Sequence, residues 1–475
     1  MAETLTPDIC VIGGGSGGLS VAAAAAAFGV SVVLLEKGEM GGDCLNYGCV
    51  PSKAMIAAGK HAQAFRDAPK FGVTGGKPKV NFKQVHDHVH DVIGAIAPMD
   101  SVERFESLGV TVIQEAGRFI DAKTVQAGNT KIKARRFVVA TGSGAFVPPI
   151  PGIDKVKYLT NETLFDQTRN PSKMIVIGGG PIGIEMAQAH QRLGAKVTVI
   201  EGAVAMGNDD PELAAIVLDK VQEDGVTILE KTKVVELEPV DGGGVRVHVE
   251  TADSRDVVEG DTLLIATGRK ASVDGLGLDK AGIETNRRGI VVDKKMRTSN
   301  RKVYAIGDVA GGLQFTHMAG YHAGIVIRAI LFRLPAKENT HIIPWCTYTD
   351  PELAHVGHTE KSAREEIGKI TILRWPLAEN DRAQAERKTT GLIKIVTRKN
   401  GKIEGVSIAG TNAGEMMNFW ALAIAKGLKV KDITEYVSPY PTMSEIGKRA
   451  ATSYFTPATK KPWIRGVISF LRSFG

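Results

Sequence analysis

A glycine-rich unit occurs twice in this chain and strongly limits the folds that the chain can adopt. The first copy begins with an apolar run at 8–12, continues through the glycine-rich residues 13–18 and an alanine-rich helical segment, and ends after a second apolar run at Glu36. The same order recurs over 173–201. The first glycine and the acid are 23 positions apart in both copies, 13 to 36 and 178 to 201. Strand, turn, helix and strand in this order predict two parallel α/β folds.

Each residue type in the repeated unit has a physical role. Glycines at this spacing permit a tight turn, close approach of the backbone to a pyrophosphate, and close packing of the helix. The start of the helix attracts an anion, and the acid can accept hydrogen bonds from ribose hydroxyls. The sequence therefore predicts two dinucleotide sites. The candidate binding residues are Gly13, Gly15, Gly18 and Glu36 in the first copy and Gly178, Gly180, Gly183 and Glu201 in the second.

Further matched segments support two cofactor sites. An Ala-Thr-Gly sequence follows an apolar strand at 137–142 and again at 263–268. Small residues at these points let the chain pass beneath a cofactor, which adds Thr141, Gly142 and Gly268 to the candidates. One more apolar strand, 303–307, ends at an acid, Asp308.

Two cysteines, Cys44 and Cys49, follow the first unit within the segment 41–53. Thiols five positions apart can form a disulfide that closes a small loop and opens without unfolding the chain. We expect a helix to start just after Leu45, so that its backbone N–H groups favour a thiolate. Beside a bound flavin, such a pair becomes a two-electron relay. A metal site and two inert core thiols are the alternatives.

Length and composition bound the class of protein. A chain of 475 residues is expected to form two to four domains. The other cysteines, Cys10 and Cys346, fall in apolar runs and are expected to be packing residues, so the pattern indicates one redox pair in a reducing compartment. No apolar run is long enough to span a bilayer, and we expect a cytoplasmic protein.

The last twenty residues, 456–475, differ from the rest of the chain. They contain four of the basic residues that make the net charge +7 and no acid, so the positive charge does not spread over a face as it would in a nucleic-acid-binding protein. Apolar residues recur there at helical spacing. A basic amphipathic helix of this kind either lies on an anionic membrane or docks on its own dimer.

The segment 41–53 resembles the active-site motif of the pyridine nucleotide-disulfide oxidoreductases. That family includes dihydrolipoamide dehydrogenase, glutathione reductase and mercuric reductase, and the resemblance extends to about Tyr454. It implies an α/β fold with two Rossmann-like dinucleotide-binding domains, as in glutathione reductase, and a C-terminal α+β domain that forms a homodimer. The implied boundaries are 1–150 and 273–340 for the FAD domain, 151–272 for the NAD(P) domain, 341–455 for the dimerisation domain and 456–475 for the tail.

The resemblance also implies cofactors and roles. FAD is expected at the first site and NADH or NADPH at the second, where Glu201 would repel a 2′-phosphate and favour NADH. Cys44 would attack the substrate, and Cys49 would face the flavin. Lys53 would pair with Glu185 near the flavin N5, with a solvated surface pair as the alternative. The remaining implied flavin contacts are Gly42, Asp308 and a helix that begins near His317.

Some positions depart from the family pattern. The family carries a His before Pro-Thr, held by a Glu five positions later; here Glu445 is present but Tyr440 replaces the His. A Tyr, whose ordinary pKa is about 10, donates a proton but rarely takes one at neutral pH. Mercuric reductases carry a Tyr at this position, yet their C-terminal cysteine pair is absent here. A plain packing role for Tyr440 is the alternative.

Further departures lie near the flavin and the cysteines. Pro181 stands where many family members have a Tyr that shields the flavin, which favours reaction with oxygen or quinones. Asp43 precedes Cys44, and its charge would raise the pKa of that thiol unless it is neutralised.

These features predict an FAD-dependent NAD(P)H oxidoreductase with a redox-active disulfide, acting on a disulfide or dithiol such as lipoamide. The first alternative is a mercuric-reductase-like enzyme that reduces a metal ion or quinone. The second is a flavin-bearing electron-supply subunit that docks to a membrane or a protein. No resident metal is predicted, since His86 and His90 share a helical face without a visible third ligand.

Overall fold

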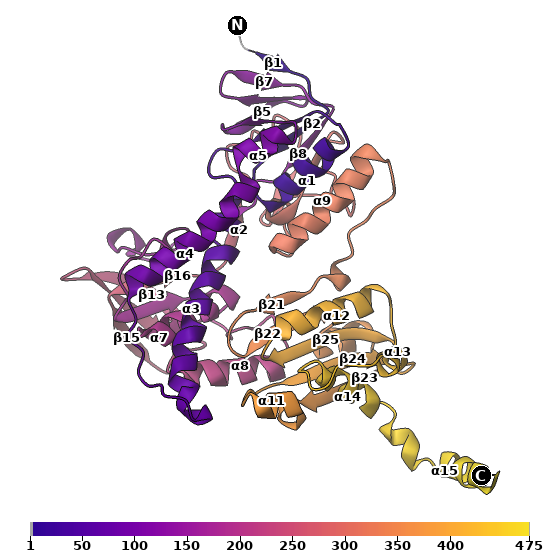
Figure 1. Cartoon of the computed structure of the whole chain (residues 1–475). Coiled ribbons are helices and arrows are strands. Elements are labelled where there is room, and N and C mark those ends of the chain that lie inside the picture. Colours follow the sequence, from indigo (N-terminus) through magenta and orange to yellow (C-terminus); the bar gives the residue numbers. More distant parts are fainter. Residues whose placement is uncertain (1–2, 475) are drawn as a thin grey trace. The chain divides into compact units, whose positions relative to one another are not determined.

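The computed structural model describes residues 3–474 (Figure 1). Contacts within the chain define two compact units, each described here by itself. The first unit contains residues up to 179, 189–202 and 231–338, and the second contains 180–188, 203–230 and 339 onward. The expected boundaries at 150, 272, 340 and 455 stay predictions.

A five-stranded parallel sheet organises the first unit. Its strand order is β20-β8-β2-β3-β4, and every neighbouring pair is parallel. The strands are β2 (Ile9–Ile12), β3 (Val32–Leu35), β4 (Val110–Ile113), β8 (Arg136–Val139) and β20 (Val303–Ala305). Helices α1 (Ser16–Ala27) and α9 (Thr316–Leu331) pack against each other on this sheet. This arrangement confirms the first predicted α/β fold.

Both faces of this sheet are buried. In β2, Ile9 and Val11 belong to the apolar core that contains α1 and α9, whereas Cys10 and Ile12 belong to a second core on the other face. Alternate residues of a strand point to opposite faces, so an unbroken apolar strand is what a sheet covered on both sides requires. Cys10 is fully buried, as expected of a packing residue.

A second parallel sheet contains the second glycine unit. Strand β10 (Lys173–Ile177) pairs in parallel with β11 (Lys196–Ile200) and with β16 (Thr262–Ile265). An antiparallel meander follows β11 in the chain, formed by β13 (Lys233–Val240), β14 (Gly244–Glu250) and β15 (Arg255–Gly260). The other elements of the first unit that carry the site are α2 (Gly42–Asn46), α3 (Cys49–Asp67), α4 (Phe82–Ile96), β9 (Ser143–Ala145), β17 (Arg269–Ala271) and η4 (Gly307–Ala310).

The second unit is built on a five-stranded antiparallel sheet, which fits the predicted α+β dimerisation domain. Its order is β21-β22-β25-β24-β23, and Figure 1 shows helices α12 and α14 beside it. The strands are β21 (Trp345–Thr347), β22 (Glu352–Gly357), β23 (Ile370–Pro376), β24 (Leu392–Arg398) and β25 (Ile403–Gly410). The helices are α8 (Pro211–Glu223), α10 (Glu360–Glu366), α11 (Asp381–Ala385), α12 (Ala413–Ala425), α13 (Val430–Glu435), α14 (Glu445–Ser453) and α15 (Pro462–Leu471).

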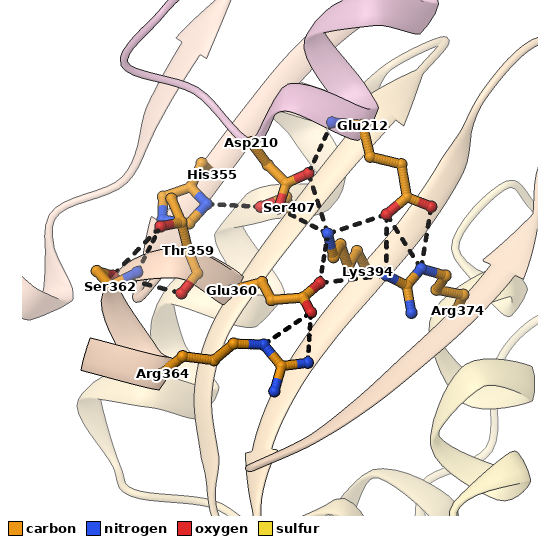
Figure 2. A network of polar contacts seen from close by, with 10 residues as sticks. All are labelled: Asp210, Glu212, His355, Thr359, Glu360, Ser362, Arg364, Arg374, Lys394 and Ser407. Atoms are coloured by element: carbon orange, nitrogen blue, oxygen red, sulfur yellow. Dashed lines mark hydrogen bonds and ion pairs between the residues drawn. The ribbon is translucent and has the colours of Figure 1, made fainter. Parts of the chain in front are cut away.

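A buried lysine in this sheet joins it to helix α8. Lys394 on β24 is only 4% exposed, and its Nζ lies 2.8 Å from Asp210, 2.9 Å from Glu212 and 2.8 Å from Glu360 (Figure 2). Asp210 caps the start of α8 through a hydrogen bond from the Glu212 N–H. Sequence patterns gave no sign of this contact. We call these four residues, with Arg374 and Arg364, the Lys394 cluster.

The charges of the Lys394 cluster balance, three acids against three bases. Arg374 binds Glu212 at 2.9 Å and Glu360 at 3.2 Å, and Arg364 binds Glu360 at 2.6 Å. Hydrogen bonding to Lys394 lowers the pKa of Glu360 to about 2. The resulting stabilisation is complete above the pKa that Glu360 has in the unfolded chain and is lost as the pH falls toward 2.

We expect Lys394→Ala to destabilise the protein by about 3–5 kcal/mol, because it removes the lysine that pairs with the buried Asp210 carboxylate. The first transition in chemical denaturation, followed by fluorescence, measures the effect. Lys270→Ala is the matched control, since Lys270 forms an exposed ion pair with Asp274 that is worth about 1 kcal/mol or less. A Lys394→Ala loss no larger than that of Lys270→Ala would show that the cluster is not a structural junction.

Candidate active site

The first glycine turn leaves no space for side chains at two of its predicted positions. A Cβ on Gly13, which has φ +112°, would lie 2.4 Å from the Ala140 carbonyl oxygen, and one on Gly18 would lie 1.9 Å from the Gly13 oxygen. The N-cap residue of α1, Gly15, makes no side-chain capping bond, so the helix start is left for an anion. These features fit the pyrophosphate of a dinucleotide.

The second turn reproduces the geometry of the first. A Cβ on Gly178, with φ +114°, would lie 2.4 Å from the Ala266 oxygen. The acids match as well: Glu36 accepts from the Gly14 N–H at 2.6 Å, and Glu201 accepts from the Gly179 N–H at 2.7 Å. Each carboxylate is therefore held at its turn by a backbone amide.

The cysteine segment lies against the first turn. Gly41 N–H donates to the Gly14 oxygen at 2.9 Å, and a Cβ on Gly42 would lie 2.8 Å from the Gly15 Cα. Helix α2 starts at Gly42 and carries Cys44. The single helix expected after Leu45 is instead two helices, because α2 ends at Asn46 and α3 begins at Cys49.

This break places Cys49 at the start of one helix and its sulfur next to the start of another. It is the first residue of α3, and its Sγ lies 3.3 Å from the hydroxyl of Thr316, the first residue of α9. The hydrogen bond from Cys44 contributes most to lowering the pKa of Cys49 to about 6, and the Thr316 hydroxyl and the Lys53 charge add to it. The same Cys44–Cys49 contact, with burial, raises the pKa of Cys44. The reduced pair therefore holds one thiolate and one thiol.

An arginine that sequence reasoning missed connects this segment to Asp308. Arg269 on β17 lies 3.0 Å from Asp43 and 3.6 Å from Asp308, and it donates to Ser143 Oγ at 2.7 Å. Asn161 also donates to Asp43 at 2.9 Å. Both contacts offset part of the Asp43 charge, but that charge still contributes to raising the pKa of Cys44, as expected. Arg269 directly follows the predicted Gly268, so its position in the sequence was a usable signal.

Asp308 is positioned as a half-buried acceptor. It belongs to η4, and Ser143 donates to it at 2.5 Å. Burial raises the pKa of this carboxyl, against the opposing effects of Ser143 and Arg269. Thr141 donates to the Ser272 oxygen at 2.8 Å, while Gly142 and Gly268 have φ of +67° and +130°. The predicted helix near His317 is α9, with His317 as its second residue.

Three further predicted residues, Glu185, Tyr440 and Glu445, lie in the second unit. Glu185 is buried and accepts from the Tyr348 N–H at 2.8 Å, which does not fit the solvated alternative for this residue. Tyr440 is 69% exposed and donates to Asp381 at 2.9 Å, and this bond raises the pKa of Tyr440. Within residues 3–474, the buried Glu445 Oε2 has no hydrogen-bond partner. The Lys53–Glu185 pairing stays a prediction.

Comparison with known proteins decides the family. Residues 7–323 match the family described as "Pyridine nucleotide-disulphide oxidoreductase", and residues 343–451 match its dimerisation domain. The chain belongs to this family. The enzyme is therefore an NAD(P)H-dependent flavoprotein oxidoreductase, its cofactor is FAD, and it carries the domain through which the family forms homodimers.

Individual relatives cover nearly the whole chain. A mercuric reductase of Lysinibacillus sphaericus is 34% identical over 452 residues, 94% of this chain and 82% of the relative. A dihydrolipoyl dehydrogenase of Geobacillus stearothermophilus is 32% identical over 458 residues, 94% and 95% of the two chains. The structure of a Cu(II) complex of RclA, an HOCl-induced flavoprotein disulfide reductase from Escherichia coli, matches with TM-score 0.84 and 26% identity, over 94% and 99%.

We expect Thr316→Val to raise the pKa of Cys49 by roughly half to one unit. One hydrogen bond contributes about 0.5–1.5 kcal/mol, and one pKa unit corresponds to about 1.4 kcal/mol. Iodoacetamide modification of the reduced enzyme across pH, with the two cysteines resolved by peptide mass spectrometry, gives the midpoint, which is expected near 6 in the original chain. Thr316→Ser keeps a hydroxyl and should leave the midpoint in place. Equal midpoints for Thr316→Val and the original chain would contradict a role for this hydroxyl.

Proposed function

We propose that this enzyme uses NADH to reduce a disulfide substrate of the lipoamide class through the Cys44–Cys49 pair. The observation that carries the proposal is the unequal acidity of the two sulfurs: the pKa of Cys49 is lowered to about 6 and that of Cys44 is raised. FAD at the first turn would relay the two electrons of the nicotinamide to the cysteine disulfide. Gly13, Gly15, Gly18, Glu36 and Asp308 are the residues we propose to hold it.

The reduced cysteine pair can then exchange with a substrate disulfide. Cys44 gives up its proton and attacks one substrate sulfur, so a Cys44–substrate bond forms, the substrate S–S bond breaks, and the released sulfur takes up a proton. Cys49, already a thiolate, attacks Cys44 and reforms the Cys44–Cys49 disulfide. The second substrate sulfur leaves as a thiolate and takes up a proton from solvent. In sum, NADH, a proton and one disulfide give NAD⁺ and two thiols.

Residue 440 supports this direction. Dithiol oxidation in the family needs a base at this position, and the Tyr440 hydroxyl is a weaker acid than an ordinary tyrosine because it donates to Asp381. Such a hydroxyl stays protonated at neutral pH and cannot take a proton from a dithiol, whereas the thiolate released by disulfide reduction can be protonated by solvent. Disulfide reduction is thus favoured over oxidation of a dithiol.

The same contact also supports a second candidate, reduction of a thiophilic metal ion. Thiolates bind soft metal ions directly, and electron transfer to such an ion requires no proton from Tyr440. Several relatives are named mercuric reductase. Pro181 is the first residue of α7 (Pro181–Leu193), a position that proline occupies readily, so no aromatic ring stands there to shield the flavin.

Glu201 supports NADH over NADPH. Its carboxylate follows strand β11 and is held by the Gly179 N–H, and the following residues 202–207 contain no Arg or Lys to bind a 2′-phosphate. A phosphate beside this carboxylate would be repelled.

We expect anaerobic titration with NADH to produce a long-wavelength absorbance band after two electrons, because the Cys49 thiolate would lie beside oxidised flavin. NADPH should produce the band only at higher concentration. Simple bleaching of the flavin without this band would contradict a relay through the cysteines.

Turnover of the Cys44→Ser variant then identifies the acceptor. Lipoamide reduction should be lost, while transfer to a quinone should stay largely unchanged. The original enzyme is assayed with lipoamide and with Hg²⁺. If the enzyme turns over Hg²⁺ but not lipoamide, metal-ion reduction would be favoured over disulfide reduction. If the Cys44→Ser variant still reduces lipoamide, the proposed thiol–disulfide exchange would be ruled out.

The tail supports a further proposal, contact with an anionic membrane by a cytoplasmic enzyme. Within residues 3–474 no helix is long and apolar enough to cross a membrane. Helix α15, however, has no buried residue, and its Trp463 and Phe470 are 66% and 64% exposed. The four basic residues of the tail complement an anionic lipid surface.

We expect the FAD-loaded enzyme to co-sediment with phosphatidylcholine vesicles that contain phosphatidylglycerol, and much less with phosphatidylcholine alone. Deletion from Pro462 should abolish binding, because it removes the apolar face and two of the four basic residues. Trp463→Ser with Phe470→Ser keeps every charge and should weaken binding strongly. Unchanged co-sedimentation after the deletion would contradict membrane binding by the tail. The alternative, that α15 docks on its own dimer, would then be favoured.

A further inference from the structure

Two histidines and a glutamate meet in the second unit, in a group that the proposed function does not use. His341 lies in η5 (Thr340–Ile342), His358 follows β22, and Glu404 lies on β25. One ligand atom from each of the three lies within 4.8 Å of the others. The two imidazole rings are 4.6 Å apart between centroids. This spacing brings together three side chains that are each a common ligand of transition metals.

The two oxygens of Glu404 have different partners. Oε1 binds Arg398 at 2.5 Å and Lys402 at 3.0 Å, whereas Oε2 faces His341 Nε2 at 3.7 Å. The carboxylate side chain is buried, and its basic partners fix its orientation from one side. Oε2 is thereby directed toward the imidazoles.

His358 is oriented by a hydroxyl. Its Nδ1 lies 3.2 Å from Ser362 Oγ, and Ser362 in turn donates to the Thr359 carbonyl oxygen at 3.3 Å. Figure 2 shows Ser362 and Thr359 side by side at the edge of the Lys394 cluster. Since the hydroxyl proton is used in this way, the Ser362 oxygen accepts from the Nδ1–H. The lone pair of His358 is then on Nε2, which makes Nε2 the nitrogen that can bind a metal.

We propose that His341, His358 and Glu404 form a binding site for a zinc-type divalent transition metal ion. Two imidazole nitrogens and one carboxylate oxygen suit zinc, with a fourth position for water, whereas Mg²⁺ and Ca²⁺ prefer oxygen ligands alone. Bonds of about 2.0–2.2 Å bring neighbouring ligand atoms roughly 3–4 Å apart, so small side-chain rotations complete the site. The site shares no residue with the cysteine segment, and the proposal does not depend on the electron acceptor.

Zinc binding to the FAD-loaded enzyme tests this site. Because Cys44 and Cys49 would themselves bind Zn²⁺, all variants carry Cys44→Ser and Cys49→Ser. Competition against a chromophoric zinc chelator should give one equivalent of tightly bound Zn²⁺. His341→Gln and His358→Gln should each weaken binding at least tenfold. Ser362→Ala should weaken it by roughly 10- to 100-fold, since Ser362 orients a ligand without touching the metal.

The pair His86 and His90 on α4 provides the matched control. Its rings are 4.2 Å apart between centroids, but His86 Nδ1 contacts Asp87 at 3.0 Å and His90 Nε2 contacts the Phe165 oxygen at 3.2 Å. His86→Gln with His90→Gln should leave the zinc affinity unchanged. Flavin absorbance and thermal melting verify that each variant is folded. Zinc binding that survives both His341→Gln and His358→Gln, or that is lost in the control, would overturn the proposal, as would the absence of zinc binding.

Discussion

The candidate active site depends on a backbone contact between two glycine segments. A Cβ on Gly42 would lie 2.8 Å from the Gly15 Cα, and Gly41 is hydrogen-bonded to Gly14. Such an approach is open to glycine and closed to residues with side chains. It brings the start of α2 onto the turn that fits a pyrophosphate. The position of Cys44 relative to the cofactor turn is thereby set by main-chain packing rather than by flexible side chains.

The different acidities of the two cysteine sulfurs also depend on the local backbone. Because α2 is short and α3 starts afresh at Cys49, the two thiols meet across a break between helices instead of along one helix. Cys49 then receives the partial positive charge of a helix start, the Thr316 hydroxyl and the Lys53 charge together. Arg269 pairs with Asp43 on the other side of the break. The local backbone geometry thus favours a thiolate at Cys49 and a thiol at Cys44.

Residues close in sequence were predictable, and contacts between distant segments were not. The glycine turns, the acids Glu36 and Glu201 and the cysteine pair follow from spacing, because a turn of this kind needs particular residues at fixed offsets. Thr316 reaches Cys49 across 267 positions, and no pattern records such a distance. Arg269 could have been noticed beside Gly268, but its contact with Asp43 could not. Lys394 likewise resembles a solvated strand residue until its three carboxylate partners are known. The expected helix after Leu45 was misplaced because Gly48 interrupts it.

The Lys394 cluster has a consequence for how the chain reaches its final state during synthesis. Asp210 and Lys394 are 184 positions apart, so α8 leaves the ribosome long before the lysine that neutralises its first turn exists. Until β24 is made, the carboxylates of Asp210 and Glu212 are stable only in water. The surface of α8 that later packs on the sheet must therefore stay hydrated, and this part of the molecule closes late. The cluster makes completion of the C-terminal sheet a condition for docking a helix that was translated far earlier.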